Sequence, residues 1–282
     1  MTISYRMRRN VSTGALYGTT AFVLLLIGFP AYWLITTSVK PSIDQATYPP
    51  VIIPTHFTLD SYTSVFKTDG VPRAFMNSAN IALATTVLTT FLGSLAAYAL
   101  AKTYLSFTLR RIIMLWILVT RIFPPITTAI PYYVVIKRLH LGDTYLAVIL
   151  TYVSYGLPFV IWLMLGFFQD LPADIEKAAI VDGCSMWQRF RQVVLPLALP
   201  GLAVTAIFAF IYSWNELLYA SMLTSFHAKT VPVVVAGFIS DQYLRWGEMS
   251  ALGSMMILPV LLFAALTQRY LVRGLTFGAV KG

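Results

Sequence analysis

Residues 176–196, EKAAIVDGCSMWQRFRQVVLP, form a charged and amphipathic stretch that lies between two long apolar runs. Gly183, in its middle, has the position of a residue that stops a short helix. Ser185 and Gln188 follow with the spacing of a capping box, which opens a second helix. The stretch therefore predicts a helix, a glycine turn and a second helix over residues 170–194.

The first of these helices has a start signal upstream of the quoted residues. Asp170 is the expected N-cap, and Pro172 lies in the first turn, where the missing N–H group of proline does no harm. Ala178 and Ala179 are small enough to let the surface of a partner approach closely. Two interpretations stay open: the element docks in a groove of another protein, or it lies on the lipid headgroups.

The apolar runs around this stretch set the class of the protein. The chain has 282 residues, of which 58% are hydrophobic and 11% are charged, and its mean hydropathy is +0.74. Soluble domains carry about 25% charged residues. A membrane-spanning helix needs about 20 mostly apolar residues. The sequence therefore predicts an all-α, polytopic membrane protein that forms a single transmembrane domain over residues 1–282. Its six transmembrane helices are expected at about 15–37, 75–101, 112–135, 144–168, 195–222 and 249–268.

Lysines and arginines decide the expected orientation of these spans. The formal net charge is +9, and the basic residues gather at the ends of the apolar runs. This distribution indicates membrane topology rather than nucleic-acid binding. With six spans both termini lie on one side, and that side carries most of the lysines and arginines. The positive-inside rule therefore places both termini and residues 170–194 in the cytoplasm.

Two charged side chains fall inside the predicted spans. Arg121 lies one turn before Pro124 and Pro125, which interrupt helical hydrogen bonding at membrane depth. It either lines a solute pathway or is a structural arginine that reaches the interface. Glu216, beside Asn215, lines a pathway, pairs with Arg121 or lies near the outer interface.

Small residues recur along the second span. They follow one another every four positions, a spacing that lets helices approach closely; the residues are Ala82, Thr86, Thr90 and Ser94. This face packs either inside the bundle or against a second membrane subunit.

No pattern in the sequence supports catalysis. Gly183-Cys184-Ser185 faintly resembles an intramembrane serine protease motif, but no histidine lies in a predicted span to act as the base. The chain lacks a Walker A loop, and its three histidines do not have metal-ligand spacing. We therefore expect no catalytic residue, no metal and no cofactor on this chain. A passive channel stays an alternative, because pore-lining rings require an oligomer.

The stretch at 176–196 resembles the cytoplasmic signature of ABC importer permeases. That signature reads Glu-Ala-Ala, three residues, Gly, nine residues, Ile, one residue and Leu-Pro. Its counterparts here are Lys177-Ala178-Ala179, Gly183, Val193 and Leu195-Pro196. Lys177 stands where the family most often has glutamate, and the adjacent Glu176 is the candidate to supply the displaced charge.

The resemblance covers essentially the whole chain. The segments MNSANIA, YSWNELL and the tail RGLTFGAVKG are similar to those of maltose-type carbohydrate permeases. An ABC type I importer permease fold is thereby implied. In that family the two-helix element docks in a cleft of the ATPase subunit, and the tail reaches into the interface of the ATPase dimer. The outer loop, here about 224–248, meets the extracytoplasmic substrate-binding protein, and a second homologous permease completes the pore.

The resemblance implies two groups of functional residues. The coupling set contacts the ATPase, and the pathway set lines the route of the solute. The coupling set is Glu176, Lys177, Ala178, Ala179, Asp182, Gly183, Phe190, Leu195 and Pro196. Because sugars favour aromatic faces and convergent polar groups, the expected pathway set is Arg121, Tyr152, Tyr155, Trp214, Asn215, Glu216 and Tyr219.

The resemblance implies a transport subunit in the cytoplasmic (inner) membrane of a bacterium or archaeon. ATP and Mg bind to the partner ATPase, and the imported solute is a sugar or polyol. The alternatives are another solute such as glycerol phosphate, which an additional cation in the cavity would favour, and a passive channel.

Overall fold

The computed structural model describes residues 2–102, 105–238 and 244–276, which form helices, turns and loops without a β-strand. The all-α prediction is confirmed for this part of the chain. Four of its helices are long and apolar enough to cross a membrane, and two bent helix pairs raise the number to six if each pair is one span. The count of six spans and the side of the termini stay predictions.

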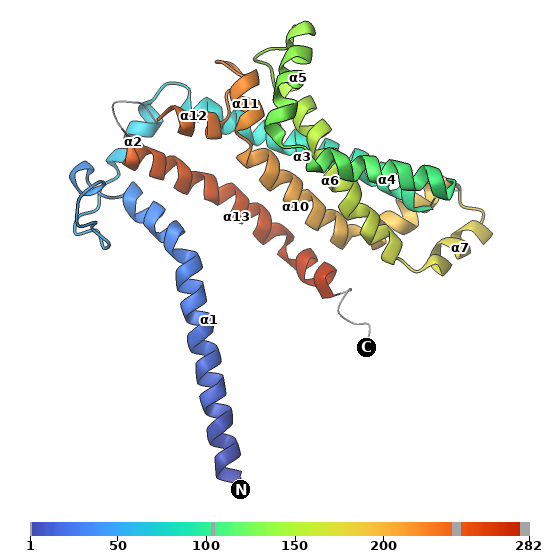
Figure 1. Ribbon diagram of the computed structural model, residues 1–282, viewed down its shortest axis with the longest axis horizontal. Helices are drawn as coiled ribbons and strands as arrows, with labels where there is room; N and C mark the ends of the chain where they lie inside the picture. The colour runs from blue at the N-terminus through green and yellow to red at the C-terminus, as the bar shows by residue number, and fades with distance from the viewer. Residues whose placement is uncertain (1, 103–104, 239–243, 277–282) are drawn as a thin grey trace. The chain divides into compact units, whose positions relative to one another are not determined.

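The chain divides into two compact units, and the first consists of Met1–Asp69 and Gly237–Ile257. Its elements are α1 (Thr2–Ser38), η1 (Ser42–Asp44), α2 (Asp60–Lys67) and the first part of α13 (Trp246–Thr276) (Figure 1). The Gln45 side chain connects the loop to α13: it accepts a hydrogen bond from the Gly247 N–H at 3.0 Å and donates one to the Lys40 carbonyl at 2.9 Å.

Lys40 is a buried cation of this first unit. Its side chain is fully covered, and Nζ lies 4.1 Å from the centroid of the Trp33 ring. Burial lowers the pKa of Lys40, and the nearby charge of Asp44 opposes that shift only in part. The aromatic face thus takes the place of water as the partner of the ammonium group.

The second unit consists of Gly70–Ala236 and Leu258–Gly282. Its centre is formed by α3, α6 and α10, which pack against one another (Figure 1). Small residues allow this packing: a Cβ on Gly93 of α3 would overlap Val160 of α6, and one on Gly201 of α10 would overlap the Phe167 ring. Elements of the unit are α3 (Val71–Lys102), α4 (Phe107–Ile122), α5 (Pro125–Arg138), α6 (Tyr145–Asp170), α7 (Ala173–Val181), α8 (Met186–Gln188), η2 (Arg189–Val194), α9 (Leu195–Leu197), α10 (Leu199–Asn215), α11 (Leu218–Leu223), α12 (Val231–Gly237) and the end of α13.

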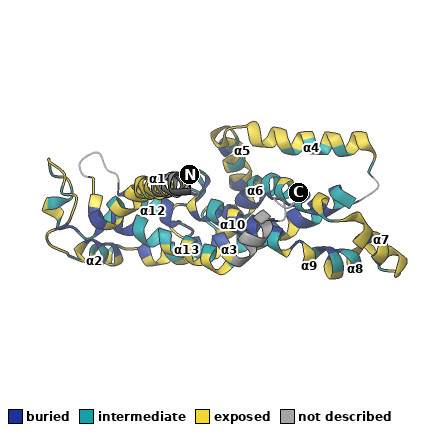
Figure 2. Cartoon of the chain, turned by 90° about the horizontal axis from the view of Figure 1, so that it is seen from below, coloured by how far each residue is buried: buried dark blue, intermediate teal, exposed yellow. Residues whose placement is uncertain are grey.

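The sequence predicts one transmembrane helix at about 112–135, but this third apolar run forms two helices. It consists of α4 and α5, which meet at an angle of 98°. Pro124 and Pro125 stand at the break, where a proline cannot donate the hydrogen bond that would continue α4. None of the residues of α4 is buried, and the helix is exposed along its length in Figure 2.

The fifth apolar run also departs from a single helix over 195–222. The helical segment Met186–Leu197 turns by 79° into α10, which has Ala198 as N-cap and a proline in its first turn. A second break follows α10, because Glu216 and Leu217 leave the helical path before α11 begins at Leu218. The interruption at Pro124 and Pro125 in the third run was predicted from the prolines, whereas the breaks in the fifth run were not predicted.

Candidate functional site

The two-helix element of residues 173–194 comprises α7, α8 and η2 and begins after a different cap from the one expected. Asp170 is the last residue of α6, and Pro172 is the N-cap of α7 without a side-chain hydrogen bond. The prediction of Asp170 as N-cap is therefore wrong. The extended backbone of Leu171 and Pro172 ends α6 before α7 starts, in agreement with the extended bias of a residue before proline.

Gly183 forms the turn that was predicted. Its φ is +79°, in the left-handed region. The Gly183 N–H donates to the Ile180 carbonyl at 3.0 Å, and the Cys184 N–H donates to the Ala179 carbonyl at 3.0 Å. This pair of bonds is a Schellman motif, with Asp182 as the C-cap of α7.

The capping box at the start of the second helix is confirmed. The Ser185 hydroxyl accepts from the Gln188 N–H at 3.3 Å, and the Gln188 side chain accepts from the Ser185 N–H at 2.7 Å. The helix continues as the π-helical turn η2, whose Phe190 and Val194 are buried. Phe190 packs on Tyr98 of α3 with a ring separation of 5.1 Å.

Glu176 is buried and faces its own chain. Its carboxylate accepts a hydrogen bond from the Tyr98 hydroxyl at 2.7 Å. It pairs with Lys102 at 3.3 Å and with Arg189 at 3.7 Å. The partners come from α3 and η2, so this ionic cluster joins both helices of the element to the end of α3. Buried carboxylates require such partners.

Lys177 lies on an exposed face of α7. Its ammonium is exposed and pairs with Asp174 at 3.0 Å, a surface contact of the kind that contributes about 0–1 kcal/mol. Ala178 is exposed and Ala179 is buried. Leu195 is half-buried and Pro196 is exposed.

Sequence reasoning missed three members of the ionic cluster: Tyr98, Lys102 and Arg189. Tyr98 and Lys102 are four residues apart and lie on one face at the end of α3. That spacing was a usable signal, but only the packing of α7 against α3 shows that Glu176 meets them.

Several large apolar side chains of the two-helix element are exposed to the surroundings of the chain. We call Ile180, Val181, Met186 and Trp187 the apolar rim; all four are exposed, and Val181 is exposed to 87%. Exposed apolar side chains at a helical turn indicate a surface that a partner or a lipid layer covers.

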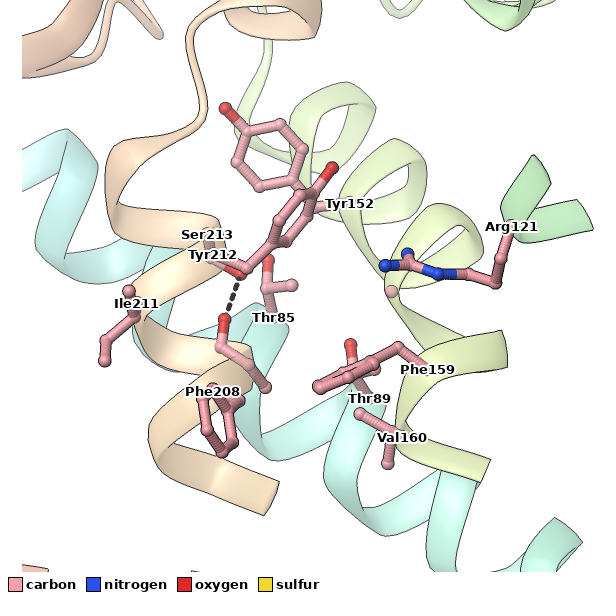
Figure 3. A pocket seen from close by; sticks show the side chains of 12 residues that line it. Thr85, Thr89, Arg121, Tyr152, Phe159, Val160, Phe208, Ile211, Tyr212 and Ser213 are labelled. Atoms are coloured by element: carbon pink, nitrogen blue, oxygen red, sulfur yellow. Dashed lines mark hydrogen bonds between the residues drawn. The ribbon is translucent and has the colours of Figure 1, made fainter. Parts of the chain in front are cut away.

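A cavity of about 230 Å³ lies among α3, α4, α6 and α10. Its wall is mostly apolar and includes four aromatic rings, and Arg121 reaches into it from α4 (Figure 3). The residues that line it are Thr85, Thr89, Arg121, Tyr152, Gly156, Phe159, Val160, Phe208, Ala209, Ile211, Tyr212 and Ser213. Two of the predicted pathway residues, Arg121 and Tyr152, belong to it.

The other predicted pathway residues surround the cavity or lie apart from it. Tyr155 stacks on Tyr212 of the cavity wall at 5.5 Å. The Tyr219 hydroxyl hydrogen bonds with the Thr128 hydroxyl at 2.6 Å. Trp214 is buried and stacks on Phe210.

Asn215 and Glu216 mark the end of α10. Asn215 is exposed and donates to the carbonyl of Ile211 at 2.8 Å. The Glu216 carboxylate accepts from the N–H groups of Tyr219 at 3.0 Å and Ala220 at 3.2 Å, and so caps α11. Among the described residues Arg121 has no ion pair, so the predicted pairing of Glu216 with Arg121 is not present.

Asp143 organises the loop that begins at Thr224. It has a left-handed backbone, with φ at 59°, and its carboxylate accepts hydrogen bonds from the N–H groups of residues 225–228 at 2.9–3.1 Å. Burial pushes the pKa of Asp143 upward, but these backbone hydrogen bonds together lower it to about 2. The expected outer loop 224–248 is thus ordered at its start, and residues 239–243 lie outside the described residues.

Comparison with known proteins assigns the fold and the family. Residues 89–277 match the family described as binding-protein-dependent transport system inner membrane component. The chain is 37% identical over 264 residues to the trehalose transport system permease protein SugB of Mycobacterium tuberculosis, covering 92% of this chain and 95% of that protein. It is 34% identical over 273 residues to the trehalose/maltose transport system permease protein MalG of Thermococcus litoralis, covering 92% and 97%.

A solved structure has the same fold. It is the crystal structure of a bacterial ABC transporter involved in the import of the acidic polysaccharide alginate, which aligns with a TM-score of 0.74 over 93% of this chain and 96% of that chain. The sequence identity is 22%, so the likeness concerns the fold alone.

Proposed function

Because the chain belongs to the family of binding-protein-dependent transport system inner membrane components, we propose that it is the permease subunit of an ATP-driven importer for a sugar or polyol. Two relatives that align over nearly their whole length carry trehalose or maltose in their names, which supports the sugar class. The chain is a transporter subunit and not an enzyme, and ATP with Mg is held by a separate ATPase.

The two-helix element is the observation that carries the coupling role. It presents the apolar rim of Ile180, Val181, Met186 and Trp187 outward, while Glu176 ties its inner side to α3. An apolar helix face that enters a groove of a soluble partner is a common docking mode. Docking to the ATPase explains both the exposed apolar rim and the ionic cluster on the inner side of the element. A helix that only rests on lipid headgroups does not require the ionic cluster with α3.

The ionic cluster supports separate roles for Glu176 and Lys177. The Glu176 carboxylate is occupied by Tyr98, Lys102 and Arg189, so it does not supply the displaced acidic contact to the ATPase. Lys177 and Asp174 are exposed beside the apolar rim and are the charges that the ATPase meets. Movement of the docked element is transmitted through the ionic cluster to α3 as a rigid-body displacement.

The remaining partners follow from the family and the predicted topology. The two-helix element faces the cytoplasm, and the loop that Asp143 organises faces the extracytoplasmic binding protein. A second, homologous permease covers the exposed α4 side and completes the pathway. The tail RGLTFGAVKG, expected at the ATPase dimer interface, lies outside the described residues from residue 277 onward. The host membrane is the cytoplasmic membrane of a bacterium or archaeon.

The experiment that tests this function is purification through a tag on this chain, followed by mass spectrometry and reconstitution into liposomes. We expect an ATPase, a second permease and a binding protein to copurify. The binding protein is then screened for its sugar ligand, and uptake of that labelled sugar is measured with ATP and with ADP inside the liposomes. Uptake only with ATP and binding protein supports the proposal. Uptake that needs no ATPase would instead identify a channel.

A further inference from the structure

Arg121 has no anionic partner among the described residues, although it reaches into a mostly apolar cavity. Its guanidinium lies 5.4 Å from the ring centroids of both Tyr155 and Phe159. A cation–π contact attracts the charge without forming a hydrogen bond, so the N–H donors of the guanidinium stay available. Figure 3 shows the guanidinium directed from α4 toward α6.

No acidic side chain is among the residues that line this cavity in the described part of the chain. Glu216 is near the end of α10, but its carboxylate is engaged by the N–H groups that begin α11. A cation at membrane depth is costly without a counter-charge. The wall of the cavity therefore carries a cation that forms no ion pair among the described residues.

Two hydroxyl groups of the same cavity are unpartnered. Thr85 is 2% exposed and Thr89 is 1% exposed, and neither Oγ1 has a hydrogen-bond partner among the described residues. By contrast, Thr86 donates to the Ala82 carbonyl at 2.7 Å, and Ser94 donates to the Thr90 carbonyl at 2.6 Å. A buried polar group without a hydrogen-bond partner is destabilising. Thr85 and Thr89 are four residues apart on α3, so both hydroxyls serve one side of the cavity.

These three observations define a ligand: an anionic group for Arg121, hydroxyl groups for Thr85 and Thr89, and a ring that stacks on aromatic side chains. We propose that the cavity binds a sugar that carries an anionic group, a carboxylate, phosphate or sulfonate, with Arg121 as its cationic contact. The proposal rests on the proposed function of sugar import and narrows the solute to anionic sugars. Charge-assisted hydrogen bonds to Arg121 are stronger than neutral ones, so a neutral sugar of the same shape binds less well.

The test measures binding to the purified complex without its binding protein, which removes the selectivity of that subunit. The probes are glucose, glucuronic acid and glucose 6-phosphate, and their dissociation constants come from saturation-transfer difference NMR. In the wild-type complex we expect at least one anionic probe to bind about tenfold or more tightly than glucose. Arg121→Gln removes this preference, and Arg121→Lys retains part of it. Arg111→Gln, on an exposed position of the same helix, is the matched control and keeps the preference.

Three results would overturn the inference. The first is a wild-type complex that binds no anionic probe more tightly than glucose. The second is an Arg121→Gln complex with an unchanged preference. The third is an anionic phospholipid that native mass spectrometry finds on the wild type and not on Arg121→Gln, because Arg121 then holds a lipid headgroup. None of these results affects ATP-driven uptake of a sugar, so the proposed function is tested separately.

Discussion

Glu176 and Lys177 are neighbours in sequence but lie on different faces of one helix. Glu176 is buried among Tyr98, Lys102 and Arg189, and Lys177 is exposed. A one-residue step on a helix turns the side chain by about 100°. The displaced glutamate of the signature is therefore an internal contact of this chain, and its loss should affect the chain itself.

Glu176→Gln should loosen the two-helix element. The change keeps the shape of the side chain but leaves Lys102 and Arg189 without their counter-charge, at a cost of roughly 1–3 kcal/mol in local stability. Hydrogen exchange of the amides of residues 173–194 measures this opening. Lys177→Gln is the matched control, because its surface ion pair contributes little. Faster exchange in Lys177→Gln than in Glu176→Gln would contradict the ionic cluster.

Asp143→Asn should release the loop of residues 225–228. The folded-state pKa of Asp143 is about 2, below the ordinary value of about 3.9. The carboxylate therefore stabilises the loop at every pH above about 4, and that stabilisation is lost as the pH falls through the folded-state value. Amide protection factors of residues 225–228 should fall over this acid range in the wild type. In Asp143→Asn they should be low already at neutral pH, and full protection there would argue against the carboxylate as the organiser.

A substitution at Gly183 tests the role of the turn between the two helices. The Cβ of valine would meet no atom within 4 Å at this position, so any effect comes from the left-handed backbone and not from a clash. Gly183→Val should cost about 1–2 kcal/mol and uncouple ATP hydrolysis from uptake in the reconstituted complex. Gly183→Asn is the control, because asparagine tolerates this conformation. Normal uptake by a well-expressed Gly183→Val complex would count against the docking role of the turn.

The close approach of α3 and α6 depends on Gly93. A methyl group there overlaps Val160, so Gly93→Ala should destabilise the protein by about 1–3 kcal/mol. Gly166→Ala in α6 has open space around its Cβ and is the control; it should be neutral or slightly stabilising, since alanine favours helices. Thermal unfolding in detergent measures both. Equal melting temperatures for the two variants would show that α3 and α6 do not pack at Gly93.

Signals confined to a few residues predicted local structure well. The Gly183 turn and the Ser185–Gln188 capping box each depend on neighbours in sequence, and both are present. The partners of Glu176 were not predicted, because Tyr98 lies 78 positions earlier and meets it only through tertiary packing. The breaks beside Pro124 and Glu216 were also missed as changes of direction, because hydropathy reports the composition of a run and not the continuity of its helix.

The cavity was predicted only in part, for a related reason. Arg121 and Tyr152 stood out by charge and residue type, whereas Thr85 and Thr89 are ordinary residues of an apolar span. These hydroxyls are buried because the face of α3 that carries them turns toward α6 and α10. That orientation follows from close packing at glycines such as Gly93, and no alternation along the sequence reveals it.

The molecule exposes apolar surface that an isolated chain in water would not tolerate. No residue in the most apolar window of α1 is buried, and α4 has no buried residue. Lipid covers such surfaces in a membrane, and we propose that a second permease covers part of them. The apolar rim differs from both, because it belongs to the short helices of the two-helix element, and we propose that a soluble partner covers it.

The central claim is that the two-helix element faces the cytoplasm and docks with an ATPase. Its most direct test is labelling of Val181→Cys in a Cys184→Ser background with a membrane-impermeant maleimide, in inside-out vesicles with and without the ATPase and in right-side-out vesicles. Val181 is 87% exposed at the tip of the apolar rim. Phe107→Cys, exposed on the same predicted side, and Ile43→Cys, exposed on the other, are the controls in the same background.

We expect the Val181→Cys variant to react only in inside-out vesicles and to be protected by the ATPase, while the Phe107→Cys variant reacts with or without it. The Ile43→Cys variant should react only in right-side-out vesicles. Reaction of the Val181→Cys variant in right-side-out vesicles, or equal reaction with and without the ATPase, would contradict the claim.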